Sequence, residues 1–92
     1  GTESDMPRLF IPPLLKPYCK GATEAIVEGT TVREAVESLD EMYPGVKERL
    51  CPEDTLRAGL SVTVDQNVTP RGLSEKVSPE SEIHFLPAIG GG

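Results

Sequence analysis

The alternation of apolar and polar positions predicts two strands near the start of the chain. In residues 7–13 (PRLFIPP), Leu9 and Ile11 share one face of the run and Phe10 lies on the other. Residues 22–29 (ATEAIVEG) form a second β-prone run that ends in glycine. Because a loop with Gly and Pro joins the two runs, we expect them to pair as a hairpin.

A change to helical spacing marks the middle of the chain. The residues that form this apolar stripe are Val32, Ala35, Val36, Leu39, Met42 and Tyr43. Thr31 and Glu34 fit a capping box, in which each side chain satisfies the backbone N–H of the other residue. Pro44 and Gly45 then predict the end of the helix. Residues 46–51 add a short helical turn, with Val46 and Leu50 facing inward.

Period-two alternation returns in the second half of the chain. In residues 59–65 it places Leu60, Val62 and Val64 on the inner face. A short edge strand is expected near Val68, and residues 82–87 (EIHFLP) form the last strand. The order strand, strand, helix, strand, short strand, strand predicts an α+β fold of the β-grasp (ubiquitin-like) type. It has a mixed sheet of four to five strands and one main helix on one face.

Composition and length support one small domain. With 92 residues and no repeat or linker, we expect a β-grasp domain over 6–87 and a flexible glycine tail over 88–92. Residues 1–5 resemble an expression remnant before Met6. The net charge of −6 and the aromatic content of 4% argue against nucleic acid binding. No signal peptide or membrane-length apolar run is visible, so a cytoplasmic location is expected.

The residue types that carry catalysis or bind metals are sparse. Cys19 and Cys51 have no metal-ligand spacing, and His84 is the only histidine, so we expect no metal site and no bound cofactor. Two unpaired thiols fit better than a sulfur relay through either cysteine. His84 alternates with its strand neighbours and has no nucleophile beside it, which favours a surface or partner-facing role. We therefore expect no catalytic residue.

The end of the chain is the most informative motif. Gly90, Gly91 and Gly92 follow the last strand almost directly, and glycines allow a narrow approach to the terminal carbonyl. A carboxylate resists nucleophilic attack until it is joined to the α-phosphate of ATP. The chain contains no GxxxxGK[ST] phosphate loop, so it would be the substrate of a separate activating enzyme. An inert, frayed tail remains the alternative at this stage.

Together these segments resemble the small sulfur-carrier proteins of the MoaD/ThiS family. The resemblance rests on GTTVREAVESLDEMYPGVKERL, LSVTVDQNV and SEIHFLPAIGGG, and the opening FIPPLLKPYCKG is similar to the subgroup that serves cysteine and thio-metabolite biosynthesis. It implies that Gly92 is adenylated and converted to a thiocarboxylate, with Gly91 supplying the narrow approach. Many relatives carry a residue with a side chain where Gly90 stands, a departure expected to affect partner choice rather than activation.

The same resemblance implies the partners. These are an adenylating enzyme similar to ubiquitin-activating enzymes, which uses ATP and magnesium, a sulfurtransferase or sulfide source, and an acceptor biosynthetic enzyme. The sheet face near the tail would dock on the activating enzyme, with Phe10, Leu86 and Ile89 as candidate contacts. Core packing is an equally good interpretation of Leu86. The acidic side chains of the helix are most simply its solvated face: Glu34, Glu37, Asp40 and Glu41.

Three other functions stay open at this point. The chain would fit the small subunit of molybdopterin synthase, in which the same tail enters a larger catalytic subunit. It would also fit a ubiquitin-like modifier that is joined to target lysines, or a β-grasp binding module with an inert tail. A four-thiolate redox cluster is excluded because the chain has two cysteines.

Overall fold

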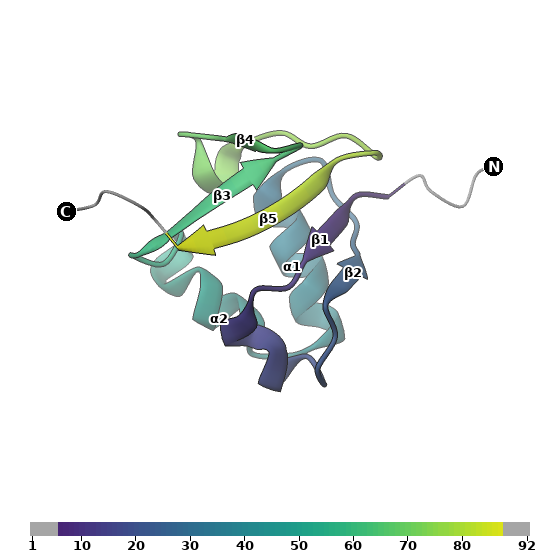
Figure 1. Cartoon of the computed structure of the whole chain (residues 1–92), viewed down its shortest axis with the longest axis vertical. Coiled ribbons are helices and arrows are strands. Elements are labelled where there is room, and N and C mark those ends of the chain that lie inside the picture. The colour runs from purple at the N-terminus through teal and green to yellow at the C-terminus, as the bar shows by residue number, and fades with distance from the viewer. Residues whose placement is uncertain (1–5, 88–92) are drawn as a thin grey trace.

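One mixed sheet of five strands organises the molecule. The computed structural model describes residues 6–87, and its strands lie in the order β2-β1-β5-β3-β4. They span Arg8–Phe10 (β1), Glu24–Ile26 (β2), Leu60–Val64 (β3), Asn67–Val68 (β4) and Glu82–Pro87 (β5). The first and last strands therefore lie side by side in the middle of the sheet (Figure 1).

The register of the sheet explains how the first and last strands come together. β1 and β5 run parallel, with Leu9 opposite Ile83. β3 pairs antiparallel with β5 along its whole length, from Leu60 opposite Pro87 to Val64 opposite Ile83. The expected hairpin of β1 and β2 is confirmed as an antiparallel pair. All remaining strand pairs are antiparallel, which makes the sheet mixed as predicted.

The main helix covers one face of this sheet (Figure 1). It is α1, Val32–Met42, and a short α2, Val46–Leu50, follows it after the predicted Pro44-Gly45 break. Three short 3-10 helices complete the described chain, at Pro13–Tyr18, Pro52–Asp54 and Gly72–Ser74. The strand order and the single covering helix confirm the predicted β-grasp fold.

The N-terminal cap of α1 differs in one detail from the predicted box. Thr31 Oγ1 accepts a hydrogen bond from the backbone N–H of Glu34 at 3.2 Å, as expected. The Glu34 carboxylate, however, accepts from the backbone N–H of Thr30 at 2.7 Å, one residue before the predicted partner. The cap still satisfies two backbone donors at the helix start, which is what a cap must do.

The predicted apolar stripe forms the core with one exception. Val32, Ala35, Val36 and Leu39 are fully buried, as are Val46 and Leu50 of α2. Met42 is instead 44% exposed, because Tyr43 takes the inward position where the chain leaves the helix. The stripe therefore continues through Tyr43 into α2 rather than through Met42.

The connection between β1 and β2 is more ordered than the sequence indicated. A 3-10 helix over Pro13–Tyr18 replaces the expected short loop. It buries Leu15 completely, and Cys19 just after it is also fully buried. The hairpin is therefore closed by a small helical lobe that contributes to the core.

The burial of one residue of β3 is the other difference. Thr63 was expected on the half-exposed face of its strand, yet it is only 5% exposed. Its cross-strand neighbours His84 and Val68 cover it from both sides.

No helix within residues 6–87 is long and apolar enough to cross a membrane. The predictions for residues 1–5 and 88–92 lie outside the described residues.

Candidate functional site

The predicted tail continues from the central strand of the sheet. β5 ends at Pro87, which lies opposite Leu60, the first residue of β3. The chain therefore leaves the sheet at the edge where β3 begins (Figure 1). Ile89, Gly90, Gly91 and Gly92, which the sequence singled out, lie outside the described residues. What the structure defines is the base from which they extend.

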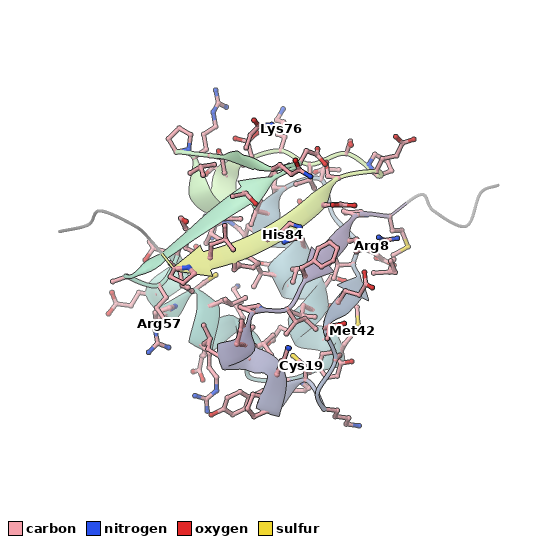
Figure 2. All side chains as sticks on the ribbon, viewed as in Figure 1. Arg8, Cys19, Met42, Arg57, Lys76 and His84 are labelled. Atoms are coloured by element: carbon pink, nitrogen blue, oxygen red, sulfur yellow. The ribbon has the colours of Figure 1, made fainter. Side chains whose placement is uncertain are left out.

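A basic side chain lies at this base. Figure 2 shows Arg57 beside the end of β5, and its carbonyl accepts from Leu60 N–H at 3.1 Å. Its N–H donates to Leu50 O at 2.7 Å and its guanidinium to Arg49 O at 3.3 Å. Sequence reasoning missed Arg57 because it stands in a loop without a motif. Only the register of β3 against β5 brings its backbone near Pro87, where β5 ends.

The sheet face opposite the helix holds a stacked aromatic pair. Phe10 of β1 and His84 of β5 stack with ring centroids 4.2 Å apart and an interplanar angle of 8°. Parallel pairing of β1 with β5 aligns these two positions across the strands. His84 is therefore a surface-facing side chain, as expected, and the ring of Phe10 is held against it rather than in the core.

Charged side chains lie on one side of this pair. Arg8 Nε lies 3.2 Å from Glu24 Oε1, and its Nη1 lies 4.0 Å from Glu82 Oε2. Glu82 Oε1 is also 3.9 Å from His84 Nε2. The side chains of Arg8, Glu24 and Glu82 are partly exposed, so water weakens the two ion pairs of Arg8 and each contributes little to stability. They give the face a defined pattern of charge.

Apolar side chains complete the face. Leu86 is 44% exposed and is directed outward, which decides against core packing for it. Ile26 on β2 is 47% exposed and lies opposite Arg8. The outer face, defined here as Arg8, Phe10, Ile26, His84 and Leu86, thus combines residues of the first two strands with residues of the last strand. Sequence analysis did not single out Ile26, although its alternation with the buried Val27 was a usable signal.

The two cysteine thiols do not reach the outer face. Cys19 and Cys51 are free and buried. Burial raises the pKa of Cys19, and burial raises the pKa of Cys51 to about 11. Both are therefore protonated at neutral pH, which makes them poor nucleophiles. In residues 6–87, no group of three or more His, Cys, Asp or Glu side chains has a metal-binding arrangement.

The acidic residues of α1 have partly structural roles. Glu34 belongs to the cap described above, and Asp40 Oδ1 accepts from Gly45 N–H at 2.9 Å and from Lys47 N–H at 3.1 Å. Glu37 pairs with the Lys47 ammonium at 3.1 Å and raises the pKa of Lys47. The prediction of a purely solvated acidic face was therefore incomplete, because Asp40 fixes the break between the two helices.

Comparison with solved structures gives close matches over nearly the whole chain. A chain of the Amycolatopsis orientalis BexX/CysO complex has a TM-score of 0.83 at 27% identity, covering 94% of this chain and 99% of that chain. CysO of Mycobacterium tuberculosis has a TM-score of 0.80 at 23% identity, covering 90% and 99%. Small archaeal modifier protein 1 of Methanosarcina acetivorans has a TM-score of 0.72 at 22% identity, covering 94% and 95%.

The last two similarities, at their low identities, establish a common fold and nothing more. No curated protein sequence matches the chain at a significant level. The model of the ThiS family, in contrast, matches residues 18–92, which includes α1, the whole of β3 to β5 and the glycine tail. From this match and the β-grasp fold we conclude that the chain belongs to the ThiS family of ubiquitin-like sulfur-carrier proteins.

Proposed function

We propose that the chain is a protein cosubstrate whose terminal Gly92 carboxylate is adenylated and converted to a thiocarboxylate. The thiocarboxylate then donates sulfide in the biosynthesis of cysteine or another sulfur metabolite. The observation that supports this most directly is the family match, which runs through residue 92 and so includes all three glycines. The glycines follow a central strand of the sheet, which adds support. A partner that binds the folded domain then also holds the start of the tail in a fixed position.

The activation chemistry explains the need for glycine. The Gly92 carboxylate attacks the α-phosphorus of ATP, a phosphorus–oxygen bond to the β-phosphate breaks, and pyrophosphate leaves. The resulting acyl-adenylate has a good leaving group. Hydrosulfide then attacks the acyl carbon, AMP departs, one proton is released, and a C(=O)S⁻ group remains. Without a side chain, Gly91 and Gly92 let phosphate and sulfide approach this carbon closely.

The catalytic groups for these steps are assigned to a separate adenylating enzyme, which would use ATP and magnesium. Within residues 6–87, both thiols are buried and His84 is stacked on Phe10. These groups have no arrangement in which one activates another for attack. A sulfurtransferase or free sulfide would supply the sulfur, and an acceptor enzyme would consume it.

We assign docking of the adenylating enzyme to the outer face. Exposed apolar side chains beside a rigid aromatic pair are typical of interaction surfaces. Phe10 and Leu86 contribute from the described residues, and Ile89 would extend the contact along the tail. The Amycolatopsis CysO relative was solved in complex with a second protein, BexX, which supports a protein partner for this chain.

Intact mass spectrometry tests the proposal. The chain ending at Gly92 is incubated with adenylating enzymes of the ubiquitin-activating type, ATP, magnesium and sulfide. The expected result is a mass gain equal to the exchange of one oxygen for sulfur. A chain lacking Gly91 and Gly92 is the matched control and should show no gain.

The same experiment separates the alternatives. No gain with any enzyme of the panel would contradict the proposal and favour an inert tail. Higher-mass ladders on other proteins, joined through lysine, would instead indicate a modifier. A stable complex with a large catalytic subunit that consumes the thiocarboxylate would indicate the small subunit of molybdopterin synthase.

A further inference from the structure

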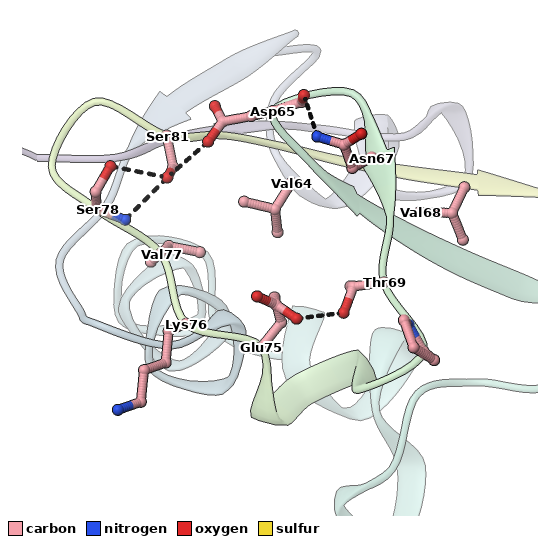
Figure 3. Close-up of a pocket in the computed structure, with 11 residues that line it drawn as sticks. Val64, Asp65, Asn67, Val68, Thr69, Glu75, Lys76, Val77, Ser78 and Ser81 are labelled. Atoms are coloured by element: carbon pink, nitrogen blue, oxygen red, sulfur yellow. Dashed lines mark hydrogen bonds between the residues drawn. The ribbon is translucent and has the colours of Figure 1, made fainter.

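A groove of about 540 Å³ lies at the edge of the sheet, and none of the five residues that define the outer face lines it. Figure 3 shows it between β4 on one side and the extended segment 75–78, which carries Val77, on the other, with Val64 between these two walls. A hydrogen bond between Thr69 and Glu75 crosses one end of the groove. Asp65 crosses the other end by accepting from Ser81 Oγ at 3.1 Å.

The first wall of the groove has a free backbone edge. β3 and β4 are joined by the two-residue turn Asp65–Gln66, with φ of 53° and 74°, and Thr69 N–H donates to Val62 O at 3.2 Å. In this register Val68 opposes Thr63 at a non-hydrogen-bonded position. The N–H and C=O of Val68 therefore point away from β3, toward the groove that Val68 lines.

The second wall repeats this arrangement from the opposite side. Val77 N–H donates to Thr30 O at 2.9 Å, and Val32 N–H donates to Glu75 O at 2.9 Å. These two hydrogen bonds flank an antiparallel bridge between Thr31 and Lys76. Thr31 and Lys76 form a non-hydrogen-bonded pair, in which the backbone of Lys76 makes no hydrogen bond to Thr31. The N–H and C=O of Lys76 consequently face the other side of the segment, where Lys76 lines the groove.

We propose that this groove binds an extended segment of a partner protein, which adds a strand between β4 and segment 75–77. Extended backbone is the ligand that offers alternating N–H and C=O groups to two such walls at once. β4 is only two residues long, a common way of limiting pairing at a sheet edge. Its Val68 is nevertheless 67% exposed, more than any other large hydrophobic residue of the described chain. Small apolar side chains of the ligand would face Val64 and Val77.

The position of the groove makes this a binding site separate from the tail. It lies at the Val64 end of β3, whereas the tail departs opposite Leu60 at the other end. A partner held in the groove would leave the five outer-face residues and the end of β5 uncovered. The inference therefore goes beyond the proposed sulfur chemistry, and its failure would not affect that chemistry.

Peptide selection followed by NMR tests the site. A phage-displayed library of random heptapeptides is selected on the whole chain, and the enriched peptides are synthesised and titrated to about 1 mM. In the free protein, the amides of Val68 and Lys76 should exchange rapidly with solvent, while those of Thr69 and Val77 are protected. Bound peptide should slow exchange at Val68 and Lys76 specifically.

Proline variants remove one outward backbone N–H, and alanine variants at the same positions control for the loss of the side chain. Lys76→Pro deletes one outward N–H, and Glu75 before it already has φ −63° and ψ 136°, which suits a residue preceding proline. Peptide affinity should fall about three- to tenfold, as expected for one lost main-chain hydrogen bond. Lys76→Ala keeps the N–H and should bind as the wild type does.

Val68→Pro and Val68→Ala form a second pair with the same expectation. Retained protection of the Val32 and Val77 amides shows that each variant is folded. Peptides that shift other amides, or no peptide that protects Val68 and Lys76, would overturn the proposal. Equal loss of affinity in the proline and alanine variants would also overturn it, because side-chain contacts would then account for binding.

Discussion

At the scale of single residues, Gly29 has the clearest steric requirement. Its φ is +138°, and a Cβ at this position would lie 2.5 Å from Glu34 Cβ and 3.0 Å from Glu34 C. Gly29→Ala should lower the free energy of unfolding by about 3 kcal/mol, from the backbone strain and the collision together. Urea denaturation followed by circular dichroism measures this loss.

Gly21 supplies the matched control for this prediction. It also has a positive φ, +79°, but a Cβ there would meet no atom within 4 Å. Gly21→Ala should therefore cost only about 1 to 2 kcal/mol, the backbone term alone. Equal losses in the two variants would show that the contact with Glu34 relaxes at no cost.

The Cys51 thiol predicts a pH dependence of stability. Burial raises its pKa from an ordinary value of 9.0 to about 11, so the unfolded chain loses this proton first. A group whose folded pKa is raised contributes stability below its unfolded pKa and loses it as pH rises to the folded pKa. We expect a decline on the order of 2 to 3 kcal/mol between pH 9 and 11.

Urea denaturation at pH 8, 9, 10 and 11 measures this decline. Cys51→Ala is the control, because it removes the titrating thiol and should show a smaller decline over the same interval. An unchanged pH profile in Cys51→Ala would contradict the assignment. The same burial predicts slow reaction of this thiol with Ellman's reagent at pH 8.

Individual side chains were the least predictable part of the sequence. The periodicity of α1 identified its four buried positions, but it gave no means to choose between Met42 and Tyr43 at the end of the helix. Thr63 lies on the predicted face of its strand and is buried only because His84 and Val68 flank it. Such outcomes depend on neighbours that are distant in sequence.

At the scale of elements, the outer face predicts a separable effect on activation. Leu86→Asp adds a charge to an exposed side chain of this face, so folding should be little affected. The KM for the carrier in an adenylation assay should rise about tenfold or more, with kcat nearly unchanged, because docking is weakened and the tail is intact.

Met42→Asp is the control for this effect. Met42 is equally exposed at 44%, but it belongs to α1 on the other side of the sheet. It should leave the KM within a factor of two of the wild type. A similar rise in both variants would indicate that general charge repulsion, rather than docking at the outer face, determines the KM.

Elements with a strong local pattern were predictable. α1, α2, β3 and β5 follow from periodicity with nearby Pro and Gly, and β4 follows from the turn residues beside it. The 3-10 helix Pro13–Tyr18 was not predictable, because its two prolines indicate a loop and its burial of Leu15 depends on the packed core. The groove was missed for a similar reason: its second wall is an extended segment without strand periodicity.

At the scale of the whole molecule, the central position of β5 predicts how truncation acts. β5 pairs with both β1 and β3, so a chain ending at Ser81 loses the middle of the sheet. It should show no cooperative thermal transition by circular dichroism. A chain ending at Gly90 keeps every described strand pair and should melt within a few degrees of the full chain. Cooperative melting of the chain ending at Ser81 would contradict this account.

The global arrangement was predictable only as far as its class. The order of elements indicated a β-grasp fold, and the terminal glycines with the family resemblance indicated where sulfur chemistry would occur. The parallel contact of β1 with β5 joins segments about seventy residues apart, and no local pattern encodes such a pairing. The stacking of Phe10 on His84 follows from that contact, whereas the placement of Arg57 near the end of β5 follows from the antiparallel register of β3 against β5.

The pairing of the first strand with the last has a consequence for partner selection. Phe10 comes from the first strand and Leu86 from the last, and they share a surface only once β1 and β5 have paired. An incomplete or unfolded chain would still possess its glycines but would present no such surface. A partner that binds the outer face before it admits the tail would therefore bind only folded carriers. ATP would then be consumed only in the activation of correctly folded molecules.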